Sequence, residues 1–117
     1  MIYREQGDYN RAEPLFKRAL AIVETALGPE HPLVAFVLND LALLYSKQDR
    51  FADAEHLFER ALAIREDRLG PDHPDLATSL ESYAALIQKT GRTDEAIEME
   101  ARANSIRARH AETNPAN

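Results

Sequence analysis

The residues of this chain best suited to chemistry are two histidines that stand beside carboxylates in nearly identical settings. His31 follows Glu30 in the stretch LGPEHP, and His73 follows Asp72 in the stretch LGPDHP. An imidazole beside a carboxylate can ligate a metal ion or take part in general acid–base catalysis. The sequence therefore carries either one reactive site twice or one structural joint twice.

The spacing of the two stretches favours the joint. Gly28 and Gly70 stand 42 residues apart, and the same interval relates His31 to His73. Over a full period, residues 3–44 against 45–86, about half of the positions are identical, and a weaker third copy starts near residue 87. Ligands must come within about 2 Å of a metal ion. Two histidines on separate layers of a repeating structure are therefore not expected to share one.

Each residue of the joint has a structural role. Gly28 and Gly70 are expected to end helices with a positive φ, and the proline after each prevents continuation of the helix. The second proline suits the first helical position, and the histidine before it can cap the helix or pack. The chain has no cysteine and no glycine-rich phosphate loop. We therefore predict no metal site, no cofactor and no catalytic residue, and a protein that is not an enzyme.

Apolar residues at three- and four-residue steps predict two helices in each period. We place helices near residues 9–27, 33–47, 51–69, 75–89 and 93–110, in a single domain over 1–110 with a polar tail at 111–117. The domain divides into a partial repeat 1–28, a repeat 29–70 and a capping repeat 71–110. Residues 1–8 are expected to contain the end of a helix that is half missing. Pro14 is expected to bend the first helix or to delay its start.

Composition limits the classes of partner. The 117 residues suit one domain, and the net charge of −6 argues against general binding to nucleic acid, which requires a basic face. No apolar run approaches the roughly 18 residues that a membrane span requires. The charged N-terminal stretch MIYREQGDYN lacks the apolar core of a signal peptide. We therefore expect a cytoplasmic protein that binds neither nucleic acid nor membranes.

The stretch LALLYSKQDRFADAEHLFERAL resembles a tetratricopeptide repeat. The matching residues are Leu41, Ala42, Tyr45, Phe51, Ala54, Phe58 and Ala61. The period of 42 exceeds the usual 34 residues, and with the LGPDHP joint it is similar to the kinesin-light-chain-like subgroup. The resemblance covers nearly the whole chain. It implies an all-α, right-handed superhelical solenoid of antiparallel helix pairs, about two and a half repeats long. It also implies a protein–protein interaction scaffold that binds a peptide or helix of a partner in its concave groove.

The resemblance further implies that the first helix of each pair lines the groove. The positions carried over are Arg4, Glu5, Phe36, Asn39, Asp40, Leu43, Lys47, Thr78, Glu81, Ser82, Ala85, Gln88 and Lys89. The subgroup often has paired asparagines that bind a peptide backbone, and only Asn39 keeps that type here. Lys47 and Lys89 are equivalent and could form a basic ladder for an acidic peptide. Alternatively, they only complement the dipole at the helix C-terminus.

A structural role is the alternative to partner binding. Glu100 stands where the preceding repeat has Phe58, and Asn104 where it has Leu62, so the last helix has the polar outer face of a solenoid cap. The half repeat at the other end predicts exposed apolar surface on helix 9–27. Because such patches usually associate, we expect self-association through the N-terminal helices.

Overall fold

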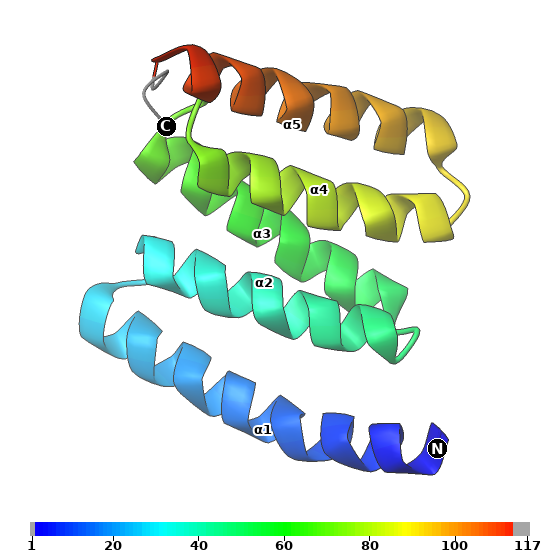
Figure 1. Ribbon diagram of the computed structural model, residues 1–117. Coiled ribbons are helices and arrows are strands. Elements are labelled where there is room, and N and C mark those ends of the chain that lie inside the picture. The colour runs from blue at the N-terminus through cyan, green and yellow to red at the C-terminus, as the bar shows by residue number, and fades with distance from the viewer. Residues whose placement is uncertain (1, 114–117) are drawn as a thin grey trace.

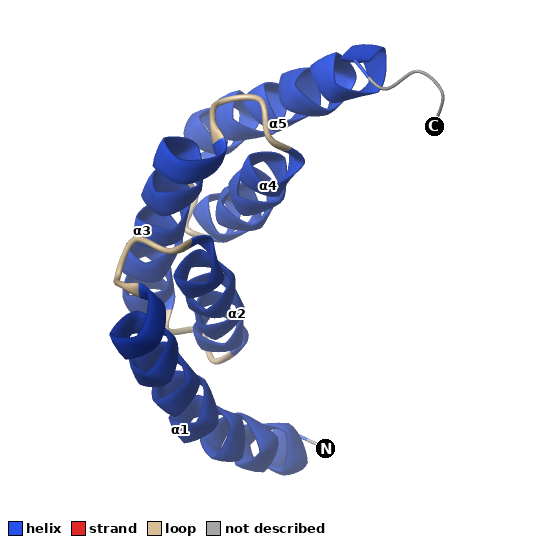
Figure 2. Ribbon diagram, turned by 90° about the vertical axis from the view of Figure 1, so that its left-hand side faces the viewer, coloured by secondary structure: helices blue, strands red, loops and turns tan. Residues whose placement is uncertain are grey.

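The computed structural model describes residues 2–113, with side chains from Gly7 to Glu112. This part of the chain forms α1 (Ile2–Leu27), α2 (Pro32–Lys47), α3 (Phe51–Leu69), α4 (Pro74–Lys89) and α5 (Thr93–Thr113). Successive helices run antiparallel (Figure 1). Figure 2 shows an arc in which α1, α3 and α5 form the outer layer, while α2 and α4 lie on its inner side. The expected all-α solenoid of helix pairs is confirmed.

The arc is open rather than spherical. Its Cα radius of gyration is 15.2 Å, whereas a compact domain of this length has a value of about 13 Å. Each inner helix is enclosed by the outer helices on either side of it. This arrangement leaves one side of α2 and α4 exposed on the inner surface of the arc.

The packing repeats with the sequence. In one cluster, Val34, Ala35 and Leu38 of α2 pack against Ala61 and Ile64 of α3. The residues 42 positions later form the next cluster between α4 and α5, and they are Leu76, Ala77, Leu80, Ala103 and Ile106. The small alanines allow close approach of the helices, as expected, and larger side chains fill the remaining space. Phe58 and Tyr83, for example, stack with ring centroids 5.9 Å apart.

The two LGP(E/D)HP stretches are joints between repeats. His31 Nδ1 accepts a hydrogen bond from the Leu33 amide at 3.1 Å, and His73 Nδ1 accepts one from the Asp75 amide at 3.0 Å. Each histidine is thus the N-cap of a helix whose first residue is proline. Gly70 has φ 92° and ψ 163°, a region open essentially to glycine alone. The structure confirms the structural interpretation of both stretches.

The start of α1 differs from the prediction. The helix begins at Ile2, not at residue 9, so residues 2–8 are not the end of a separate helix. They align with residues 44–50, the end of α2 and the turn after it, where Asp49 has φ 60°. Gly7 is the equivalent of Asp49, but it lies inside α1. Continuing the helix keeps the backbone hydrogen bonds instead.

Two further predictions concern Pro14 and the C-terminal tail. Pro14 lies inside α1 and does not delay the start of the helix. It lacks an amide donor and crowds the carbonyl four residues earlier, which bends a helix, and α1 is curved in Figure 2. The tail is shorter than predicted, because residues 111–113 belong to α5 and include the good helix formers Ala111 and Glu112. Residues 114–117 lie outside the described residues.

Candidate functional site on the inner face of the arc

We define the inner face as the exposed side of α2 and α4. Four pairs of equivalent positions are exposed in both helices, and they are Leu33 and Asp75, Phe36 and Thr78, Leu43 and Ala85, and Lys47 and Lys89. The α4 members stay exposed although α2 lies beside that helix. These positions therefore belong to an open surface and not to a gap between neighbouring inner helices.

The two helices give the inner face different chemistry. On α2 it is apolar, with Leu33 49%, Phe36 56% and Leu43 37% exposed. On α4 the equivalent residues are acidic, hydroxylated or small. Exposed apolar side chains grouped on one helix mark a surface that other molecules can cover. Leu33 was not among the positions carried over from the resemblance, although its three-residue step to Phe36 could have indicated it.

The other positions that the resemblance assigned to the groove lie partly on the inner helices and partly on an outer helix. Gln88 is exposed, and Asp40 and Ser82 are half-buried on the inner helices. Burial raises the pKa of Asp40, and the nearby charge of Arg65 partly offsets that effect. Arg4 and Glu5 lie in α1, an outer helix, so they are not on an inner helix as the alignment implied. Their side chains lie outside the described residues.

Asn39 and Glu81 are equivalent in sequence but differ in surroundings. Asn39 is only 6% exposed, and its side-chain oxygen makes no hydrogen bond within the described residues. Glu81 is exposed and accepts hydrogen bonds from Arg107 at 2.7 and 2.9 Å. These bonds lower the pKa of Glu81. Because Asn39 is buried, its amide is not presented on the inner face.

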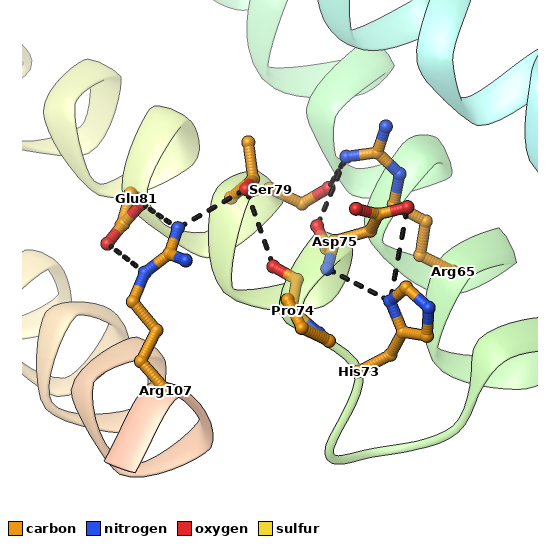
Figure 3. A network of polar contacts seen from close by, with 8 residues as sticks. Arg65, His73, Pro74, Asp75, Ser79, Glu81 and Arg107 are labelled. Atoms are coloured by element: carbon orange, nitrogen blue, oxygen red, sulfur yellow. Dashed lines mark hydrogen bonds and ion pairs between the residues drawn. The ribbon is translucent and has the colours of Figure 1, made fainter. Parts of the chain in front are cut away.

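A buried arginine joins the two repeats. Arg65 of α3 is 6% exposed, and its Nη1 donates to Ser79 Oγ at 2.8 Å and to the Asp75 carbonyl at 3.2 Å (Figure 3). Burial lowers the pKa of Arg65. At the preceding interface the equivalent residue is Val23, which packs against the apolar cluster of α2 and α3. Sequence reasoning missed this contact, although Val23 and Val37 both change to polar residues one repeat later.

Ion pairs join each outer helix to the next one, or to the residue just before it, at two equivalent places. Glu13 pairs with Arg50 and Glu24 with Arg60, each at 2.8 Å. One repeat later, the pairs are Glu55 with Arg92 at 2.6 Å and Glu66 with Arg102 at 2.8 Å. The next equivalents of the glutamates on α5 are Ile97 and Ala108. The series of acceptors therefore stops at α5.

The described residues offer little for other chemistries. They contain no group of three or more His, Asp or Glu side chains that could hold a metal ion. None of the helices within residues 2–113 combines the length and apolarity needed to cross a membrane. The inner face therefore remains the surface with the clearest capacity to bind another molecule.

Comparisons with known proteins agree with this geometry. A family model described as tetratricopeptide repeat matches residues 1–67 and 48–108. A crystal structure from Podospora anserina, of a protein assigned as a kinesin light chain with nearly identical TPR-like repeats, is 28% identical, with a TM-score of 0.79. BtubC (BKLC) from P. vanneervenii is 31% identical, with a TM-score of 0.82. A search of curated proteins found no match.

These matches cover most of this chain but a smaller share of each solved structure. The match to the Podospora anserina structure covers 91% of this chain and 50% of that one, and the match to BtubC covers 94% and 44%. This chain thus spans about half the length of the solved structures it resembles. The description of the Podospora anserina structure as a kinesin light chain agrees with the subgroup that the 42-residue period indicated.

Proposed function

Because the chain belongs to the tetratricopeptide repeat family, we propose that it binds a peptide or helix of a protein partner on its inner face. The family fold is generally a non-enzymatic protein–protein interaction scaffold. The observation that carries the proposal is the exposed apolar group Leu33, Phe36 and Leu43 on α2. Covering these side chains removes apolar surface from water and would contribute binding energy at a surface already held rigid by the helices.

The partner is proposed to carry acidic residues that bind along one edge of the inner face. Lys47 and Lys89 occupy the last positions of α2 and α4 and are exposed. Neither makes an ion pair within the described residues. Both ammonium groups are thus available to carboxylates of a ligand that lies across the two helices. The net charge of −6 argues against nucleic acid as a partner. We further propose that the protein binds its partner in the cytoplasm.

The experiment measures binding of short fluorescent peptides that carry a phenylalanine or leucine among glutamates. The variant Lys47→Glu plus Lys89→Glu should weaken binding about tenfold or more, because two exposed ion pairs are replaced by repulsion. The matched control is Arg11→Glu plus Arg68→Glu, which changes the net charge equally on outer helices. Equal affinity of both double variants would contradict the proposed role of the lysines.

A structural role is the second candidate. On α1, Leu15 is 67% and Ile22 is 58% exposed, which favours self-association through the N-terminal helices. On α5, Glu100 is exposed where its equivalent Phe58 is buried, and Asn104 is exposed where its equivalent Leu62 is half-buried, as in a cap at the end of an array. Sedimentation equilibrium tests the first part. A monomeric mass at high concentration would count against self-association.

A further inference from the structure

Arg107 of α5 reaches the inner face of α4, where it holds Glu81 (Figure 3). Its Nε donates to Glu81 Oε2 at 2.9 Å, and its Nη2 donates to Glu81 Oε1 at 2.7 Å and to Thr78 Oγ1 at 3.3 Å. Glu81 lies on the same side of α4 as Thr78 and Ala85, because steps of three and four residues return to one face of a helix. An outer helix thus brings a guanidinium group to the surface on which we propose that the partner binds.

This contact is a feature of one helix pair and not of the repeat. Arg65 is the α3 residue equivalent to Arg107, and it donates to Ser79 of the following inner helix, α4. The α2 residue equivalent to Glu81 is Asn39, which is neutral and only 6% exposed. The repeat therefore does not require the ion pair between α4 and α5.

The geometry of the pair suits an exchange of one carboxylate for another. Glu81 occupies the edge of the guanidinium with two parallel hydrogen bonds, which is also how arginine binds the carboxylates of ligands. The Arg107 and Glu81 side chains are both 44% exposed, so a ligand on the inner face can reach them. Because an exposed ion pair contributes little to stability, replacing Glu81 with a ligand carboxylate would cost the fold little.

We infer that Arg107 is a carboxylate-binding residue of the inner face, masked by Glu81 until an acidic group of the ligand replaces it. The inference rests on the proposed function and adds a second acidic contact to it. Lys89 lies about 12 Å from Glu81 along the axis of α4, and an extended peptide covers that distance with about four residues. The expected ligand therefore carries two acidic residues about four positions apart, one for Lys89 and one for Arg107.

The test measures binding of a fluorescent peptide that has two glutamates four positions apart and a phenylalanine between them. Glu81→Gln keeps the shape of the side chain but removes the charge that holds Arg107. This variant should bind the peptide about threefold or more tightly than the original chain, because Arg107 becomes available and a like charge is lost.

The matched control is Glu66→Gln. Glu66 pairs with Arg102 at 2.8 Å on the outer helices, and these side chains are 47% and 40% exposed. The control therefore changes the net charge equally and also releases an arginine, but away from the inner face. It should leave the affinity for the peptide unchanged.

Removing the arginine separates masking from simple repulsion by Glu81. Arg107→Gln should cost about threefold more affinity in the Glu81→Gln chain than in the original chain, because only there does Arg107 bind the peptide directly. Long-range effects of charge would give the same cost in both chains. Equal costs, or equal effects of Glu81→Gln and Glu66→Gln, would overturn the inference.

These outcomes are distinct from failure of the proposed function. Weaker binding by the Lys47→Glu plus Lys89→Glu variant, together with equal effects of Glu81→Gln and Glu66→Gln, would support binding on the inner face and refute the role of Arg107. Absence of peptide binding to the original chain and to Glu81→Gln alike would refute both.

Discussion

The contact between Arg65 and Ser79 gives a sharp prediction about how the two repeats are held together. Ser79→Val removes the hydroxyl that accepts from Arg65 Nη1 at 2.8 Å and leaves only the Asp75 carbonyl at 3.2 Å. A hydrogen bond to a charged group contributes about 1.5–3 kcal/mol, and Arg65 is 6% exposed. The free energy of unfolding should therefore fall by about 2 kcal/mol.

The first interface indicates how the loss can be reversed. Val23 and Val37 stand there at the positions equivalent to Arg65 and Ser79. Replacing a buried charged contact with well-packed apolar residues is often neutral or stabilising. Adding Arg65→Val to Ser79→Val should therefore restore the free energy of unfolding to within about 1 kcal/mol of the original chain.

Urea unfolding followed by far-UV circular dichroism measures these differences. Ser79→Thr is the matched control, because threonine has nearly the shape of valine but keeps the hydroxyl. Threonine should cost much less than valine. Equal costs for the two substitutions, or strictly additive effects of the Arg65 and Ser79 changes, would refute the argument that the hydrogen bond carries the stability.

Three further predictions concern the joints and the outer layer. His73→Ala should lower the free energy of unfolding by about 1 kcal/mol through loss of the N-cap, whereas His73→Asn should keep most of it, as thermal unfolding can show. A double-mutant cycle on Glu55 and Arg92 should give a coupling of about 0.5 kcal/mol that shrinks with added salt, because the pair is partly exposed. Hydrogen bonds from Lys17 and Tyr45 and the charge of Arg50 lower the pKa of Glu13. Its contribution to stability should therefore be present above the ordinary carboxyl pKa and be lost as pH falls through the lowered value, and Glu13→Gln should reduce that loss in unfolding measured across acidic pH.

The fold could be predicted from the sequence because the repeating unit contains both kinds of helix, inner and outer, and the joint between repeats. Gly28 and Gly70 located the joints, and the histidines beside them proved to be N-caps. The apolar positions of the second period predicted the clusters that α3 forms with α2. Such features depend on local spacing and on burial of one helix face, and both are visible in a single sequence.

The predictions from the sequence failed where the conformation or burial of a residue depends on which helices pack against it. The alignment treated residues 2–8 like residues 44–50, the end of α2 and the turn after it, but these residues continue α1 as one helix. Arg65 is charged, and only the packing of α4 against α3 shows that it is buried. The ion pairs of the outer layer could have been found, since Glu13 with Arg50 and Glu55 with Arg92 keep the 42-residue interval.

The placement of a bound partner on the inner face is the central claim, and site-specific photo-crosslinking tests it most directly. A photoreactive amino acid replaces Phe36 in one chain and Ile97 in another, because the two side chains are 56% and 57% exposed. Each chain is irradiated with the acidic peptide bound. Crosslinks from position 36 and none from position 97 are the predicted result, and crosslinks from position 97 alone would contradict binding on the inner face.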